Sequence, residues 1–483
     1  MKRIIMAGVA ALAITGGAFP AAYADEGDNG AATDADRARA FEIFRTVISM
    51  RTSEGHGLVP QMAAYLADEF KAAGFSEEDI HILPKDETAA LVVRYRGDGS
   101  SGKKPILFMA HMDVVDARPE DWELNPFELT EQDGYFFGRG VTDNKYGVTN
   151  LTQTFIRLKE EGFVPTRDLV IAFSGDEETG MATTKMLAHD RKDLTDAEFA
   201  LNADGGGGSL TVDGKPISYG VQAGEKTYAT YFITAHNPGG HSSAPRKDNA
   251  IYDLVHALSK IEKLEFPAMS NPITLAAFAD MGPQIGGDLG EAMVKFSENP
   301  KNKKAADVIA ANPAYVGMTR TTCVATMLDA GHAENALPQT AKATVNCRIF
   351  PGVDVAEVRQ TLIDTIADET LDVVVDGEPT VSPVSEMRDD VVAAVSKAVH
   401  ARYPGMKIGA YQSSGGTDGM HFRNAGVPTL AMSAIFMNEE DSYAHGLNER
   451  IPVKSFYDGL DHWMIIIKDL AGPKPAADQS AAD

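Results

Sequence analysis

Short apolar runs alternate with longer amphipathic segments over the first two hundred residues of the chain. The runs at 89–96, 105–111, 169–175 and 197–204 predict buried strands, and the segments at 36–51, 60–73, 145–161 and 181–190 predict helices. Strands that alternate with helices are typical of an α/β fold with a layered, mostly parallel sheet. Chemistry in such folds gathers beyond the carboxyl ends of the strands.

The pattern changes after about residue 220. Alternating apolar and polar positions predict strands at 226–236, 319–331, 340–350 and 370–377, with helical patterns at 248–264 and 354–368. Such alternation indicates a sheet with one exposed face, and therefore an inserted α+β domain. Helix–strand alternation resumes after residue 386. We therefore predict one layered domain in two parts, 36–219 and 381–472, around an insertion at 220–380. The stretch 265–320 inside the insertion has no interpretation from its residues.

The two ends of the chain have their own signals. Lys2 and Arg3 precede an apolar run at 4–17, and the small residues at 22–24 fit a cleavage site. This pattern predicts a signal peptide at 1–24 and a periplasmic or secreted protein, with a retained anchor as the alternative. The Pro- and Ala-rich segment 473–483 is predicted to be a disordered tail.

Composition and charge exclude some partners. The chain has 44 Lys and Arg against 69 Asp and Glu, a net charge of −25, which becomes −27 without residues 1–24. A surface this acidic repels nucleic acid and anionic membranes. The two cysteines, Cys323 and Cys347, form no CxxC motif, and both one disulfide and two free buried thiols fit the count.

Histidines and carboxylates stand at the ends of the predicted strands or in loops. They are His111, Asp143, Glu177, Glu178, Asp204 and His445. Each has a structural explanation on its own, as a packed imidazole, a helix cap or an acidic helix start. Together, two imidazoles and three carboxylates suit two divalent metal ions with one bridging carboxylate, which leaves Glu177 to carry a proton.

The order of six motifs identifies a resemblance to the M20 metallopeptidases. The motifs are HMDVV, GRGVTDNKYG, SGDEETG, NADGG, GGHSSAP and HGLNER. The chain resembles carboxypeptidase G2, aminoacylase-1 and the succinyl-diaminopimelate desuccinylases over roughly 36–470. The segment DWELNPFE at 121–128 is most similar to the carboxypeptidase S branch.

The resemblance implies a metal centre with assigned roles. One ion is held by His111, Asp143 and Asp204, and the other by Asp143, Glu178 and His445. Asp143 bridges the ions before a cis peptide bond, Asp113 orients His111, and Glu177 is the general base. Many relatives carry Glu at the position of Asp204, although Asp also occurs. Zinc is the default metal, with cobalt or manganese as alternatives.

The resemblance also implies a substrate site and a dimer. The insertion is similar to a lid or dimerisation domain, whose His241 reaches the partner's active site and polarises the scissile carbonyl. Candidate substrate-binding residues are Arg348, Asn335, Gly415, Gly416 and Thr417. The alternatives are a turn residue for His241, a surface ion pair for Arg348, and a helix cap for Asp418 beside the glycine loop.

These observations predict a dinuclear-metal amidohydrolase. Its substrate is a peptide or N-acyl amide next to a free carboxylate, cleaved in the manner of a carboxypeptidase or dipeptidase. An N-acyl-amino-acid hydrolase is the alternative within this chemistry. A non-catalytic periplasmic metal- or peptide-binding protein is the alternative from another class, and it predicts loss of the base or a ligand, whereas all are present.

Overall fold

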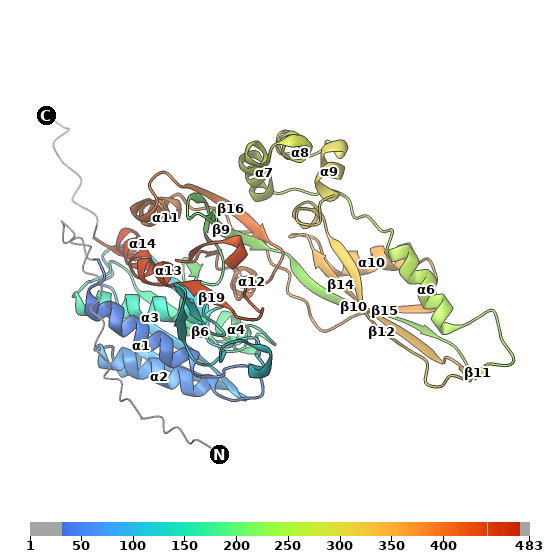
Figure 1. Ribbon diagram of the computed structural model, residues 1–483, viewed down its shortest axis with the longest axis horizontal. Helices are drawn as coiled ribbons and strands as arrows, with labels where there is room; N and C mark the ends of the chain where they lie inside the picture. The colour runs from blue at the N-terminus through green and yellow to red at the C-terminus, as the bar shows by residue number, and fades with distance from the viewer. Residues whose placement is uncertain (1–30, 442, 474–483) are drawn as a thin grey trace, which may run out of the picture.

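The computed structural model describes residues 31–441 and 443–473 (Figure 1). The predicted signal peptide and nearly all of the predicted tail lie outside these residues. Within them, no helix is both long enough and apolar enough to cross a membrane.

The larger domain is built on a ten-stranded sheet. Its order is β1-β2-β6-β3-β7-β17-β9-β8-β18, with β16 beside β9. The strands are β1 (Ile80–Lys85), β2 (Thr88–Tyr95), β3 (Ile106–His111), β6 (Leu169–Ser174), β7 (Phe199–Asn202), β8 (Gly207–Leu210), β9 (Pro216–Glu225), β16 (Lys407–Ser413), β17 (Thr429–Ala431) and β18 (Phe436–Asn438). The central neighbours β6, β3, β7 and β17 are parallel, which confirms the predicted mostly parallel sheet.

Helices cover both faces of this sheet. One face packs on α1 (Asp34–Ile48), α2 (Val59–Ala72), α3 (Lys145–Glu160), α11 (Asp389–Arg402), α13 (Val453–Asp458) and α14 (His462–Ala471). The other packs on α4 (Ala182–Lys185), the π-turn at 186–190, α5 (Lys192–Thr195) and α12 (Gly419–Asn424). Each face of the sheet packs against its helices in a separate hydrophobic core. Successive residues of β3 point to opposite faces, so Phe108 lies in one core and Leu107 in the other. Strands buried on both sides explain the continuous apolar runs.

The inserted domain holds an antiparallel sheet in the order β12-β14-β10-β15. These are β10 (Thr227–His236), β12 (Thr322–Ala330), β14 (Thr340–Ile349) and β15 (Leu371–Val375). The helices α6 (Ala250–Ile261) and α10 (Val355–Ile366) bury one face only, while Val324 and Met327 are exposed on the other. Cys323 and Cys347 lie opposite each other on β12 and β14 and form a disulfide.

The switch between the two sheets differs from the predicted boundary at residue 220. β9 continues to pair with β16 until Glu225, which lies opposite Ser413. The second sheet begins at Thr227. Residues 221–225 are buried in the large domain as part of one continuous strand, so periodicity alone did not mark the change.

The stretch that the sequence left without an interpretation is a small helical bundle. It consists of α7 (Pro272–Ile285), α8 (Gly287–Glu298) and α9 (Lys303–Ala310), around a core that includes Phe278 and Phe296. Asn271 Nδ2 donates to Gln412 Oε1 at 2.7 Å, and Lys407 Nζ lies 3.0 Å from Asp280. The bundle therefore rests on β16 of the large domain, beside the junction of the two domains (Figure 1).

Candidate active site

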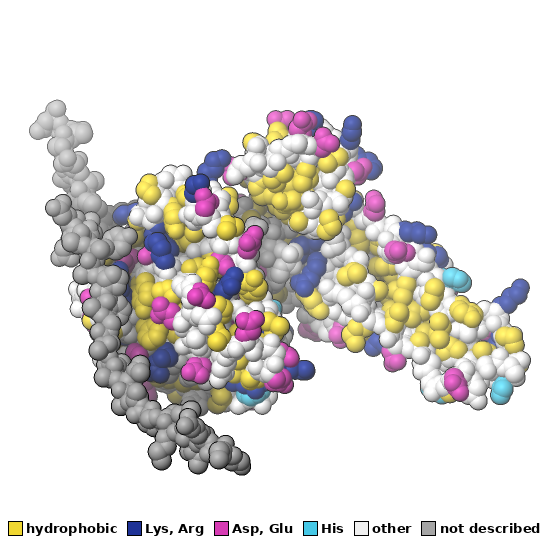
Figure 2. All heavy atoms as spheres, viewed as in Figure 1, with side chains coloured by type: hydrophobic (Ala, Val, Ile, Leu, Met, Phe, Trp, Pro, Cys, Tyr) yellow, Lys and Arg dark blue, Asp and Glu magenta, His cyan; other side chains and the backbone are white. Residues whose placement is uncertain are grey.

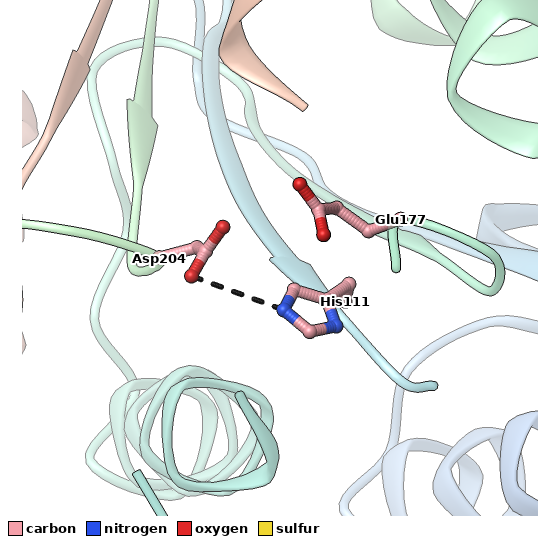
Figure 3. A group of neighbouring side chains, drawn as sticks. All are labelled: His111, Glu177 and Asp204. Carbon is pink, nitrogen blue, oxygen red and sulfur yellow. Dashed lines mark ion pairs between the residues drawn. The ribbon is translucent and has the colours of Figure 1, made fainter. Parts of the chain in front are cut away.

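His111 lies at the centre of the predicted metal site. It ends β3, and its side chain is completely buried. Its Nε2 atom lies 2.9 Å from Asp143 Oδ1 and 3.8 Å from Asp204 Oδ1. Figure 3 shows the carboxylates of Asp204 and Glu177 turned toward its imidazole. Because β6, β3 and β7 are parallel neighbours, their carboxyl ends place these residues together.

The late loop brings a second histidine to the same carboxylates. His445 Nε2 lies 2.9 Å from Glu178 Oε1 and 3.1 Å from Asp143 Oδ2. The two oxygens of Asp143 thus face different histidines, which is the arrangement that a bridging carboxylate requires. The Asp143–Asn144 peptide is cis. The structure therefore brings together all five residues predicted as metal ligands.

Asp113 connects the histidine to the acidic strand tip. His111 Nδ1 lies 3.1 Å from the Asp113 backbone carbonyl and 3.4 Å from its carboxylate. The same carboxylate accepts hydrogen bonds from the backbone N–H groups of Glu177 and Glu178, at 3.1 and 3.0 Å. One side chain therefore positions both the ring and the two adjacent glutamates.

The electrostatics of this cluster favour positive charge. Burial, together with the charge of Asp204, raises the pKa of Glu177 well above its ordinary value. Burial also raises the pKa of Asp204, to which the charge of Asp143 contributes. Hydrogen bonds from Asp143 and Glu178 raise the pKa of His445 to about 10. Divalent cations neutralise such a group of carboxylates more effectively than protons on the imidazoles do, so the donor set fits a metal centre.

Two groups of one histidine and two carboxylates are close enough to hold an ion, and the first contains Glu177 rather than Asp143. Ligand atoms of His111, Glu177 and Asp204 lie within 4.8 Å of one another, as do those of His111, Asp143 and Glu178. Histidine nitrogens mixed with carboxylate oxygens suit Zn²⁺, Co²⁺ or Mn²⁺.

Glu449 is a residue of this site that the sequence analysis missed. It is completely buried, and it accepts hydrogen bonds from the backbone N–H groups of Gly140, Thr142 and Asp143 at 3.0, 2.8 and 3.2 Å. Arg139 contacts it at 2.8 Å. Glu449 therefore shapes the loop that presents Asp143. Its place in the HGLNER motif was the available signal.

Asp418 also has a different role from the helix cap considered for it. Its side chain makes no capping hydrogen bond to α12. It accepts a hydrogen bond from Ser174 Oγ at 2.6 Å, at the end of β6, and another from Thr184. Burial raises its pKa to about 6. Asp418 therefore adds a buried carboxyl group behind the metal site.

Arg348 lies where the inserted domain meets the large one. Its guanidinium stands 4.5 Å from the Tyr228 ring centre and donates to the Ser414 carbonyl at 3.2 Å. Within the described chain no carboxylate pairs with it, which argues against the surface ion pair. The predicted glycine-loop residues follow directly: Gly415, Gly416 and Thr417.

His241 and Asn335 lie elsewhere. His241 belongs to the short strand β11 (Gly240–His241), which pairs with β13 (Ala336–Leu337). Asn335 accepts a backbone hydrogen bond from Ser242 at 3.0 Å. Figure 1 places β11 at the end of the inserted domain that points away from the large domain. Within one chain, Asn335 therefore lies with His241 and not with Arg348, because the hairpin carries both to the tip.

Comparisons with known proteins agree with this geometry. Residues 107–469 match peptidase family M20/M25/M40. The chain is 30% identical to the N-fatty-acyl-amino acid synthase/hydrolase PM20D1 of Xenopus tropicalis, over 72% of this chain and 69% of that protein. It is 28% identical to the probable carboxypeptidase S-like 1 of Dictyostelium discoideum, over 75% and 72% of the two chains.

Solved structures share the fold at low sequence identity. The M20 metallo-carboxypeptidase Sso-CP2 of Sulfolobus solfataricus superposes with a TM-score of 0.67 at 18% identity, over 91% of this chain and 99% of that one. The dinuclear metal-binding M20 peptidase YXEP of Bacillus subtilis has a TM-score of 0.58 at 12% identity, over 90% and 97%. This chain therefore belongs to peptidase family M20/M25/M40, and it is a metal-dependent amide hydrolase.

Proposed function

We propose that the protein hydrolyses the amide bond of N-acyl amino acids that carry a free carboxylate. The observation that carries this proposal is Asp143 held between His111 and His445, with Glu177 beside them. The similarity to PM20D1 supports the N-acyl substrate. Peptides with a free C-terminus are the second candidate substrate, and the similarity to a carboxypeptidase S-like protein favours it.

Two divalent cations, with zinc as the default, are the proposed cofactors. His111, Asp143 and Asp204 would hold one, and Asp143, Glu178 and His445 the other. When bound, such ions polarise an amide carbonyl and make an attacking water more acidic.

Glu177 is the proposed general base. Its carboxylate faces the ligand atoms of His111 and Asp204, and its backbone is fixed by Asp113. Burial raises the pKa of Glu177, which makes its carboxylate a stronger base. Glu177 thus takes a proton from the attacking water and returns it to the leaving nitrogen.

Arg348 is the proposed anchor for the substrate carboxylate. Its planar guanidinium matches a carboxylate in a bidentate geometry, and it lies over the ring of Tyr228. The adjoining loop at 414–417 supplies backbone groups close to the same point.

We further propose a homodimer in which His241 enters the partner's active site. β12 is an edge strand, and large exposed apolar side chains line it and α6: Tyr252, Val255, Val324, Met327 and Leu328. Figure 2 shows hydrophobic side chains gathered on this domain. Apolar edges of this kind are normally covered, and a second copy would cover them. His241 would then donate a hydrogen bond to the developing oxyanion.

Export through the predicted signal peptide gives a periplasmic or secreted protein. The disulfide between Cys323 and Cys347 supports this location, because disulfides persist in oxidising compartments. Fractionation of cells with N-terminal sequencing of the mature protein tests it. A chain that starts at residue 1 in the cytoplasm would contradict the proposal.

The function is tested with purified protein and measured metal content. We expect about two ions per chain, loss of turnover on chelation, and recovery with zinc, cobalt or manganese. An N-acyl amino acid should be cleaved, whereas the same compound with its carboxylate converted to an amide should lose at least about tenfold in kcat/KM. Metal binding without turnover of N-acyl amino acids or dipeptides would favour the non-catalytic alternative.

A further inference from the structure

Asp418 binds both ends of the loop that carries the proposed general base. This loop, the base loop (175–183), begins after β6, contains Glu177 and runs into α4. Ser174 Oγ, at the end of β6, donates to Asp418 Oδ2 at 2.6 Å, and Thr184 Oγ1, on α4, donates to Asp418 Oδ1. The two oxygens of one carboxylate therefore join the residues on either side of the base loop.

The burial of this carboxylate points to a role in the site. Asp418 is only 1% exposed, and its two hydrogen bonds come from neutral hydroxyl groups, which offset only part of the cost of burying a charge. It is not needed as a helix cap, because Thr417 Oγ1 accepts the backbone N–H of Gly419 at 3.1 Å. A neutral side chain would fill the same space at a lower cost in folding free energy, and proteins keep such costly residues mainly at functional sites.

The residues directly before Asp418 form the loop beside the proposed substrate anchor. Arg348 donates to a backbone carbonyl of this loop, the substrate loop (414–417), at 3.2 Å. Thr417 is hydrogen-bonded through its side chain and its backbone to Glu225, which is completely buried and paired with Arg423 of α12. The substrate loop is therefore held from the side of the domain junction by contacts that do not involve Asp418.

The base loop has other contacts of its own, and they serve a different purpose. Asp176 accepts two backbone N–H groups from the start of α4, at 2.6 and 2.9 Å, which fixes the shape of the loop. Asp113 accepts the backbone N–H of Glu177, which attaches the loop to the end of β3. The hydrogen bonds to Asp418 instead connect the base loop to the segment that continues from the substrate loop.

We propose that Asp418 is a positioning residue, which holds the base loop against the substrate loop so that Glu177 meets the scissile amide. The proposal rests on the proposed hydrolysis of N-acyl amino acids. Because reacting atoms must be aligned closely, a small shift of the base loop lowers the rate of the chemical step. The substrate loop keeps its contacts with Glu225 and Arg348 when Asp418 is lost, so turnover should suffer more than substrate binding.

Kinetics of Asp418 variants with N-acetyl-phenylalanine and metal-loaded protein provide the test. Asp418→Ala should lower kcat at least about tenfold and change KM less than about threefold, with the metal content unchanged. Asp418→Asn keeps the size of the side chain and one acceptor oxygen, so it should recover most of the lost kcat. Asp79→Ala removes another buried aspartate, which is bonded to Arg96 at the edge of the sheet, and serves as the matched control. Unmodified kcat in Asp418→Ala, or equal losses in Asp418→Ala and Asp418→Asn, would overturn the positioning role.

Variants of the two hydroxyl donors keep the proposal testable if Asp418→Ala does not fold. Ser174→Ala and Thr184→Val each remove one hydrogen bond to Asp418, and each should lower kcat. Their effects should not add to that of Asp418→Ala, because all three changes break the same connection. Fully additive losses would mean that the three side chains act separately, contrary to the proposal.

Hydrogen exchange separates the positioning role from the proposed function. In metal-loaded Asp418→Ala, exchange should become faster in the base loop and stay unchanged in β1 and β2 at the edge of the sheet. If no N-acyl amino acid is cleaved, the proposed function fails, while faster exchange in the base loop still supports the connection through Asp418. If hydrolysis occurs but exchange in the base loop is the same in both proteins, the positioning role is wrong.

Discussion

The two domains hold their candidate histidines in opposite ways. His111 is completely buried at the end of β3, with hydrogen-bonding partners on both ring nitrogens, Asp113 and Asp143. His241 is exposed on a strand of two residues, where its Nδ1 accepts hydrogen bonds from Ser243. The first ring has one orientation fixed by its own chain. The second is oriented only by its own loop.

The surrounding sheets differ in the same sense. Every residue of β3 and β6 is buried, because helices cover both faces of the large sheet. In the inserted domain most of β12 is exposed, and helices cover one face only. The large domain thus completes its metal site within one chain, whereas the inserted domain presents surfaces that a second molecule can complete.

The largest effect is expected at the buried base. Glu177→Gln removes the proton acceptor but keeps the shape of the side chain, so kcat should fall about a thousandfold. Metal content and KM should change little, since Glu177 is not one of the five predicted ligands. The exposed Glu120→Gln serves as the control for a neutralised glutamate. Turnover by Glu177→Gln at the unmodified rate would show that the buried cluster is not the catalytic one.

The next effect tests the exposed histidine. His241→Ala should lower kcat about a hundredfold, because one oxyanion donor is lost, and leave the metal content unchanged. The Glu177→Gln and His241→Ala variants can be unfolded, mixed in equal amounts and refolded together. Half of the resulting dimers should contain one subunit of each variant, and each such dimer holds one complete site. About a quarter of all active sites should therefore be restored. An inactive mixture of correctly mixed dimers would mean that His241 does not act across an interface.

The contrast also separates what the sequence could predict from what it could not. His111, Glu178 and Asp204 follow strands with strong apolar patterns, and parallel strands bring their ends together. Local pattern was therefore enough to gather them. Glu449 acts on Gly140 and Asp143, about three hundred positions earlier in the chain. The HGLNER motif marks its segment, but no local pattern reports such a tertiary contact, so the partners of Glu449 were visible only in the structure.

The inserted domain shows the same limit at a larger scale. Its alternating strands predicted an open sheet face, and that face is exposed. The bundle α7–α9 was missed because its position depends on contacts such as Asn271 with Gln412, far from either residue's local pattern. Asp418 was considered as a cap because Asp often precedes a helix, whereas burial beside Ser174 decides its actual partners.

Lowering the pH should destabilise the large domain, because it contains the buried His462. His462 is buried, and its pKa is lowered to about 3 by burial and by Arg402. The unfolded chain takes up this proton near 6.5, so the stability contributed by the neutral ring is complete above that pH and is lost as the pH falls toward 3. The loss should be about 1.4 kcal/mol per pH unit below 6.5.

Denaturant unfolding between pH 7 and pH 4 measures this slope. His462→Gln can keep a hydrogen bond to the Tyr219 hydroxyl, which lies 3.2 Å from the ring, without adding a titratable group. Its unfolding free energy should therefore depend less on pH. The same slope in both proteins would place the acid sensitivity elsewhere.

The most local effect is expected from the disulfide, because it should be confined to the inserted domain. Cys323 and Cys347 join β12, the exposed edge strand, to β14. Replacing both by Ala should lower the unfolding free energy of this domain by about 2–4 kcal/mol, because the unfolded loop gains freedom. Hydrogen exchange should become faster in β12 and stay unchanged in β3. Reductant should have the same effect on the unmodified protein and none on the double variant. Faster exchange at β3 as well would show that the two domains unfold as one unit, so the difference between them would lie in their exposed surfaces rather than in their stability.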